Sequence, residues 1–152
     1  MLLRESPDSP AEASKVIEPG EERMLRLMRQ WILGEEESDP KHIDEHVESV
    51  RRRARAAGER HFGIEGPDGA LVAMTNLRSD GATAQVENVY TAPEARGHGY
   101  ARTLVAYVTR LAVDAGHELT FITADDLGWP KDLYARLGFE PAARMSLFHK
   151  RL

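Results

Sequence analysis

The spacing of apolar residues predicts two helices near the start of the chain. The first is predicted over about 21–33 by apolar residues at helical spacing, namely Met24, Leu27, Met28 and Trp31. A second helix is predicted after Asp39, which is suited to cap its N-terminus. Pro40 fits the first helical position, and Gly58 is expected to end the helix. The predicted buried face of this second helix consists of Ile43, Val47, Val50, Ala54 and Ala57.

Beyond Gly58 apolar and polar residues alternate, which is typical of strands. Turn sequences at 66–69 and 79–81 interrupt the alternation, so strands are predicted over about 60–65, 70–78 and 82–91. Together they form an antiparallel meander.

A change back to helical spacing follows the meander. A helix is predicted over about 98–115 and an apolar strand over 119–123, so these elements and the last meander strand form a βαβ unit. A short helix is predicted between Pro130 and Gly138, and one or two closing strands between Phe139 and Lys150. This order of elements indicates a mixed α/β fold.

The first 20 residues differ in composition from the rest. Three prolines lie among Ser, Asp and Glu, as in a flexible arm. The apolar pairs Leu2-Leu3 and Val16-Ile17 are the two candidates there for an irregular first strand. We therefore expect an N-terminal arm over 1–20 and a single domain over 21–152.

Composition narrows the class of partner. A formal net charge of −5 over 152 residues gives no overall attraction for a nucleic acid. The chain has no cysteine, which excludes disulfides, thiolate metal sites and a cysteine nucleophile. No apolar run approaches the ~20 residues that span a bilayer, and the N-terminus lacks the pattern of a signal peptide. We expect a cytoplasmic protein that binds neither nucleic acid nor membrane.

The junction between strand 82–91 and helix 98–115 carries the most informative motif. It reads Arg96-Gly97-His98-Gly99-Tyr100-Ala101. The first turn of a helix has unpaired N–H groups and a partial positive charge, and small residues let these amides approach a phosphate. Arg96 adds a fixed cation beside them. The motif therefore predicts a phosphate-binding turn.

Two common nucleotide motifs do not fit this turn. A dinucleotide-binding turn would need Gly or Ala where Arg102 stands, and the Gly-Lys-Ser/Thr of a P-loop is absent. The sequence instead resembles the GNAT family of N-acetyltransferases, whose Arg/Gln-x-x-Gly-x-Gly/Ala signature is matched by Arg96, Gly99 and Ala101. Pro93 before the turn and the later stretch Leu133-Tyr134-Ala135-Arg136-Leu137-Gly138-Phe139 also match the family. The resemblance covers about residues 60–150.

The resemblance implies a fold and a cofactor. The implied fold is a mixed, mostly antiparallel sheet with a splayed parallel strand pair, flanked by about four helices. Acetyl-CoA is implied as co-substrate, with its pyrophosphate on the backbone of Gly97, His98, Gly99, Tyr100 and Ala101 beside Arg96. Its pantetheine and acetyl group would lie along Val89, Tyr90 and Thr91. No metal is implied, and a homodimer through the last strands is suggested.

Acetyl transfer to an amine needs a base for the amine and an acid for the departing thiolate. By resemblance Tyr134 is the candidate acid, since an ordinary Tyr, pKa near ~10, keeps its proton at neutral pH. Glu87 is the candidate base, acting directly or through water. The alternatives are a half-buried structural Tyr134 and a solvated Glu87. His98 is expected to face phosphate rather than to act as a base.

One stretch departs from the family pattern. Leu127 stands where the family usually has an Asn that contacts pantetheine. Asp125 or Asp126 could cap the short helix there, and Trp129 could either wall the acyl or acceptor site or pack beneath the loop.

Two other functions remain open at this stage. His42, Glu45 and His46 have the His-x-x-Glu-His spacing of a zinc metallopeptidase, although no third ligand is evident. A catalytically silent acyl-CoA-binding module would keep the turn and lack transfer chemistry. The arginines at 51–53 and 55 are read as cations at a helix C-terminus, with an acidic acceptor or RNA as the alternative.

The acceptor is left open by the sequence. Small amines, amino acids, antibiotics, polyamines and protein amines all remain candidates. The acidic segment Glu35-Glu36-Glu37 would favour a cationic acceptor if it lies at the mouth of the site, and a solvated loop is the alternative.

Overall fold

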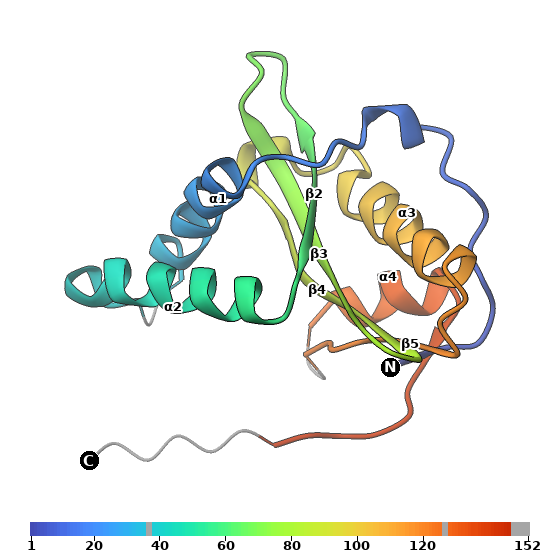
Figure 1. The fold of residues 1–152 in the computed structure, drawn as a ribbon. Helices are drawn as coiled ribbons and strands as arrows, with labels where there is room; N and C mark the ends of the chain where they lie inside the picture. The colour runs from blue at the N-terminus through green and yellow to red at the C-terminus, as the bar shows by residue number, and fades with distance from the viewer. Residues whose placement is uncertain (36–37, 126–127, 147–152) are drawn as a thin grey trace.

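One sheet runs through the middle of the protein, with helices on both faces (Figure 1). The computed structural model describes residues 1–35, 38–125 and 128–146. Within these residues the strands are β1 (Leu2–Leu3), β2 (Arg60–Glu65), β3 (Leu71–Asp80), β4 (Thr83–Thr91), β5 (Leu119–Ile122) and β6 (Phe139–Glu140). The α-helices are α1 (Glu21–Leu33), α2 (Ile43–Ala56), α3 (Tyr100–Asp114) and α4 (Pro130–Arg136), with short 3₁₀ turns η1 (Ala13–Lys15), η2 (Pro40–His42) and η3 (Pro93–Ala95).

The order of strands across the sheet is β2-β3-β4-β5-β1-β6. β4 and β5 are parallel, and the other neighbouring pairs are antiparallel. The predicted meander and βαβ unit are therefore confirmed, as is the mostly antiparallel sheet with one parallel pair. The predicted helix over 21–33 coincides with α1.

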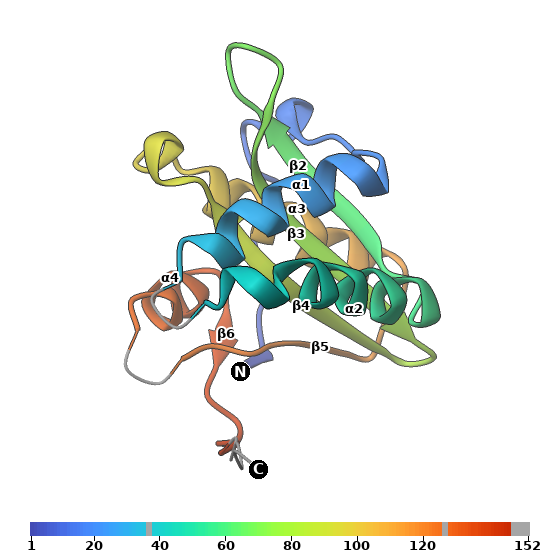
Figure 2. The same ribbon diagram turned by 90° about the vertical axis from the view of Figure 1, so that its left-hand side faces the viewer.

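Helices α1 and α2 cover one face of the sheet (Figure 2). Met24, Leu27 and Met28 of α1 are buried against Leu71 and Met74 of β3. Basic residues of α2 also hold the two helices together. Arg55 donates to both carboxylate oxygens of Glu21, at 2.8 and 2.6 Å, and Arg51 pairs with Glu22 at 3.1 Å. At least two of the arginines in this cluster thus serve helix packing.

Helix α3 covers the opposite face and forms the larger core. Its residues Leu104, Val105 and Val108 are fully buried, and they belong to one apolar cluster with Val86 of β4 and Ile122 of β5. Leu133 and Tyr134 of α4 belong to the same cluster. The core therefore joins α3, α4 and the parallel strand pair into one unit.

Three predicted boundaries move in the structure. Asp39 accepts from the amide of Lys41 as a cap, but Pro40 begins the 3₁₀ turn η2, and α2 starts only at Ile43. Helix α3 starts at Tyr100 rather than 98, because Gly99 has a left-handed φ of 75°. The prediction of closing strands up to Lys150 is wrong over 141–146, which form no strand, because Pro141 cannot continue the hydrogen-bonded ladder. Residues 147–150 lie outside the described residues.

The first 20 residues contact the sheet at two places. Leu2 pairs with Phe121 of β5 and Glu140 of β6, so β1 lies between these two strands. Ile17 forms an isolated antiparallel bridge with Gly63 of β2. Both apolar pairs that were candidates for a first strand thus pair with strands of the sheet. Leu2–Leu3 is a strand near the β6 edge, and Ile17 forms a bridge to β2 at the other edge.

Candidate active site

The parallel strands β4 and β5 separate partway along their length. Their pairing runs from Thr83 and Leu119 to Val86 and Ile122, where β5 ends. β4 continues to Thr91. This part of β4 therefore has no ladder partner on the β5 side among the described residues, which leaves backbone groups for a ligand.

A β-bulge turns β4 just beyond this point. The register with β3 shifts between Met74 and Asn76, and Asn88 within the shift has a positive φ of 53°. The buried hydroxyl of Thr75 donates to the carbonyl oxygen of Glu87 at 2.9 Å and holds the bulge from the core side. Bulges re-aim the side chains of a strand, and this one lies directly before the strand residues expected along the pantetheine.

The turn after β4 presents an open helix N-terminus. Gly97 and Gly99 have φ of 83° and 75°, values that favour glycine, and a Cβ at either position would meet nothing within 4 Å. No side chain caps α3. The first amides of α3 therefore face outward without a partner in the helix, as an anion site requires.

Arg96 and His98 are both fixed by backbone carbonyls. The Nε–H of Arg96 donates to the carbonyl of Thr91 at 3.2 Å. The Nδ1–H of His98 contacts the carbonyls of Ala95 and Arg96, each at 3.1 Å, and its ring stacks on Tyr100 at 5.5 Å. The guanidinium of Arg96 is thus held beside the turn, whereas the ring of His98 packs on the outside of it.

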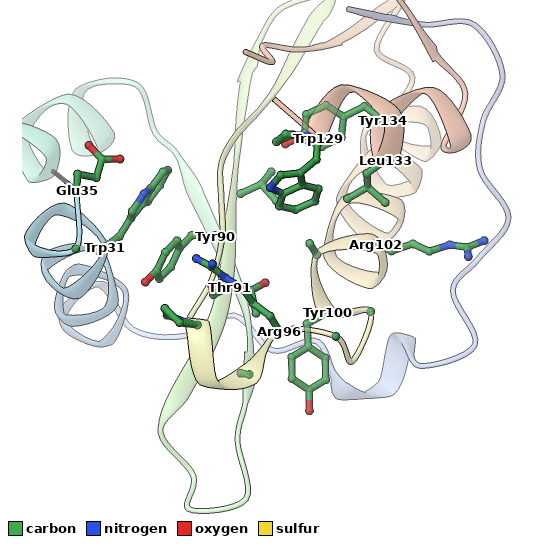
Figure 3. Close-up of a pocket in the computed structure, with 18 residues that line it drawn as sticks. Trp31, Glu35, Tyr90, Thr91, Arg96, Tyr100, Arg102, Trp129, Leu133 and Tyr134 are labelled. Atoms are coloured by element: carbon green, nitrogen blue, oxygen red, sulfur yellow. Dashed lines mark hydrogen bonds between the residues drawn. The ribbon is translucent and has the colours of Figure 1, made fainter. Parts of the chain in front are cut away.

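A cavity of about 540 Å³ lies between this turn and the helices α1 and α4 (Figure 3). Most of the predicted cofactor residues line it, namely Val89, Tyr90, Thr91, Arg96, Gly97, Gly99, Tyr100 and Ala101. Tyr134 lines the same cavity. His98 and Glu87 are not among its described lining residues. The structure thus brings one of the two candidate catalytic residues together with the cofactor turn.

Tyr134 combines burial with access to the cavity. Its side chain is 5% exposed and makes an edge contact with Phe139 at 6.4 Å. Burial raises the pKa of Tyr134 to about 12, above the ordinary value assumed from the sequence. No hydrogen bond recorded among the described residues uses its hydroxyl. The hydroxyl therefore stays protonated over the whole physiological range and can donate to a ligand in the cavity.

The raised pKa of Tyr134 has a measurable effect on stability. Above about pH 10 the unfolded chain loses the proton that the folded chain keeps, so rising pH favours unfolding. We expect the free energy of unfolding of the wild type to fall faster than that of Tyr134→Phe between about pH 10 and 12, by about 1.4 kcal/mol per pH unit. Parallel curves from denaturant titrations of the two proteins would show that the hydroxyl is not shielded from solvent.

Glu87 lies on β4 opposite Asn76 of β3. Its carboxylate accepts a hydrogen bond from the side-chain amide of Gln85 on the same strand. Asn76 in turn is buried and donates to the carboxylate of Glu59 at 3.1 Å. Glu87 therefore belongs to a polar row on the sheet, next to the cavity lining on β4 but not in it.

An aromatic group on the far side of the cavity was not identified from the sequence. Trp31 at the end of α1 stacks on Tyr90 of β4, with ring centroids 5.0 Å apart and an interplanar angle of 10°. Trp129 lines the cavity and is 68% exposed, so it does not pack beneath its loop. Glu35 also lines the cavity, whereas Glu36, Glu37, Asp126 and Leu127 lie outside the described residues.

The zinc alternative has no support in the described part of the chain. Nδ1 of His42 lies 2.9 Å from a carboxylate oxygen of Asp39, and no group of three metal-ligating side chains occurs among the described residues. Within the same residues, no helix has the length and hydropathy needed to cross a membrane.

The open part of β4, the uncapped glycine turn and the buried Tyr134 all line one cavity. The sequence matches the acetyltransferase (GNAT) family over residues 24–139. The chain therefore belongs to the GNAT family and is an acyl-CoA N-acyltransferase. No curated protein matches it in sequence.

Solved structures share its fold at low sequence identity. A putative acetyl transferase from Pyrococcus furiosus is 15% identical, with a TM-score of 0.73 over 90% of this chain and 98% of the other. Glucosamine-6-phosphate N-acetyltransferase from Arabidopsis thaliana is 13% identical, with a TM-score of 0.64, and the match covers 90% of this chain and 98% of the other. AAC(6')-Iy, in complex with the bisubstrate analog CoA-S-monomethyl-acetylneamine, is 19% identical, with a TM-score of 0.66. The match covers 90% of this chain and 97% of the other.

Proposed function

We propose that the protein transfers an acetyl group from acetyl-CoA to a primary amine by direct attack. The observation that carries this proposal is the shared cavity, which the uncapped turn of α3 and the hydroxyl-bearing Tyr134 both line. The first supplies an anion site for a phosphorylated donor, and the second supplies a proton donor. The complex of AAC(6')-Iy with a CoA bisubstrate analog supports the same use of a similar fold.

The cofactor would lie along the open part of β4. Its pyrophosphate would accept hydrogen bonds from amides between Gly97 and Ala101, with the positive charge of Arg96 beside them. The pantetheine amides would pair with the backbone of Val89 to Thr91, where β4 has no ladder partner among the described residues. The thioester would then point toward Tyr134 at the other side of the cavity.

The transfer step makes one bond and breaks another. The amine nitrogen attacks the thioester carbonyl carbon, the C–N bond forms, and the C–S bond breaks with its electron pair on sulfur. Tyr134 donates its hydrogen bond to that sulfur as negative charge develops there. Because its pKa is about 12, Tyr134 keeps its proton and stabilises the thiolate through this hydrogen bond. The proton that the amine loses would pass through water to Glu87, and the thiolate would take up one proton from water to leave as free thiol, so the step balances.

Glu87 is proposed as the base and acts through water, because its carboxylate does not line the cavity. Replacement by Gln is expected to lower kcat/KM at neutral pH by roughly 10²-fold, the lower end of the range for a positioned base. The deficit should shrink as the pH approaches the pKa of the amine, about 10.4, where free amine no longer needs a base. The measurement is kcat/KM against pH for both proteins. A deficit that stays constant with pH would mean that Glu87 has only a structural role.

The overall proposal is tested by incubating the protein with acetyl-CoA and a panel of amines. Thiol release is followed with a chromogenic reagent, and the acetylated amine is identified by mass spectrometry. We expect thiol and acetylated product in equal amounts. Acetyl-CoA binding without product from any amine would instead identify a silent acyl-CoA-binding module.

A further inference from the structure

Charge is divided unequally along the cavity. Arg96 lines the side next to the cofactor turn with its side chain, whereas the guanidinium of Arg102, which also lines the cavity, points away from it (Figure 3). Among the described lining residues the one acidic side chain is Glu35, two residues beyond the end of α1. In Figure 3 Trp31 lies between Glu35 and Tyr90, and Arg96 lies beyond Tyr90. One side of the cavity thus suits phosphate, and the other suits a cation.

The carboxylate of Glu35 differs from those of α1 in having no partner among the described residues. Within α1, Glu21 pairs with Arg55 and Glu22 with Arg51, both arginines of α2. Glu35 forms no ion pair or side-chain hydrogen bond with any described residue. It is also exposed, so a ligand can reach it without displacing a protein partner.

Trp31 beside Glu35 adds a second attraction for a cation. Its indole is held by the stack on Tyr90 and lines the cavity. A cation near an indole face is attracted by the negative charge density of the ring, and a stacked ring loses little entropy on binding. A carboxylate and an aromatic face, both lining the cavity close to the C-terminal end of α1, recognise an ammonium group better than a neutral or anionic one.

We propose that the acceptor is a polycationic amine, with one amine that reaches the thioester and a second cationic group bound by Glu35 and Trp31. This inference rests on the proposed transfer to amines and specifies its substrate class. The second group cannot be the reacting amine, because Glu35, two residues beyond the end of α1, lies across the cavity from Tyr134 of α4 (Figure 3). Acceptors with a carboxylate in its place would meet the like charge of Glu35.

A matched panel of acceptors tests this specificity. It consists of linear α,ω-diamines, the monoamines of the same chain length and the corresponding ω-amino carboxylates. For the best chain length we expect kcat/KM of the diamine, corrected for its two equivalent amines, to exceed that of the monoamine about tenfold, the combined effect of an exposed ion pair and a cation–π contact. The amino carboxylate should be the poorest of the three.

Variants assign the preference to the two residues. Glu35→Gln should reduce the ratio of kcat/KM for diamine to kcat/KM for monoamine to about threefold or less. This remaining preference would come from the cation–π contact with Trp31. Glu118→Gln removes the same charge near the start of β5, outside the cavity, and should keep the full ratio. Trp31→Phe should keep most of the diamine to monoamine ratio in kcat/KM, whereas Trp31→Leu should lower it.

Each outcome of this experiment is decisive. Equal use of diamines and monoamines, or a ratio that Glu35→Gln leaves unchanged, would overturn the polycationic acceptor while transfer to amines stands. If the protein binds acetyl-CoA but no amine of the panel causes thiol release, the transfer function is overturned, and this inference with it.

Discussion

Replacement of Gly99 by Glu is expected to abolish acetyl-CoA binding. Gly99 precedes the first residue of α3, where the uncapped amides of the turn face the cavity. Two unit charges about 4 Å apart near a protein surface repel by about 4 kcal/mol, which corresponds to roughly a thousandfold in affinity. Screening by solvent reduces this value, so we expect an increase of at least about 100-fold in the dissociation constant, measured by isothermal titration calorimetry.

A glycine at the other end of α3 provides a matched control. Gly116 follows the C-terminal end of the helix with a φ of 83°, and a Cβ there would also meet nothing within 4 Å. Gly116→Glu therefore carries the same backbone strain and the same charge, away from the cavity. It should bind acetyl-CoA as the wild type does. Similar loss of affinity in both variants would show that strain, and not charge at the turn, is responsible.

The second large effect is expected from Tyr134→Phe. Phenylalanine keeps the ring and its edge contact with Phe139 but removes the hydroxyl that donates to sulfur. Proton donors positioned in the transition state typically contribute about 10²–10⁴ in rate, and we expect kcat to fall by roughly 10²-fold or more. The dissociation constant of acetyl-CoA should stay within about twofold of the wild type, because the hydroxyl contributes little to ground-state binding.

Tyr107 provides the control for this substitution. It lies on α3 outside the cavity and contacts the ring of Phe62 at 5.9 Å, so Tyr107→Phe also removes a hydroxyl beside an aromatic neighbour. Its kcat should match the wild type. If Tyr134→Phe retained full kcat as well, Tyr134 would be only part of the core, and the assignment of an acid would be wrong.

Elements with a strong local pattern were predicted correctly from the sequence. Helix α1 and strand β2 have the predicted bounds, because periodic apolar residues and turn glycines define such elements locally. The position of β1 between β5 and β6 could not be predicted in this way. It depends on the pairing of Leu2 with residues more than 100 positions away, for which a two-residue apolar stretch gives no local signal.

The cofactor side of the site was more predictable than the acceptor side. The glycine turn depends on φ values that few residues other than glycine adopt. The glycines in the sequence are therefore enough to predict the conformation of the turn. The acceptor side depends on tertiary contacts instead. Trp31 fits the apolar face of a helix, and nothing in its own neighbourhood indicates that it stacks on Tyr90 of a distant strand. The raised pKa of Tyr134 likewise comes from burial, which the motif alone does not give.

In the proposed complex, the turn of α3 and Tyr134 hold the two ends of one acyl-CoA molecule. A crystal structure of the protein with coenzyme A tests it most directly. We predict that the pyrophosphate contacts backbone amides between Gly97 and Ala101 and that the sulfur lies within hydrogen-bond reach of the Tyr134 hydroxyl. If the phosphates bind elsewhere, or the sulfur points away from α4, the turn and Tyr134 do not act on one acyl-CoA molecule.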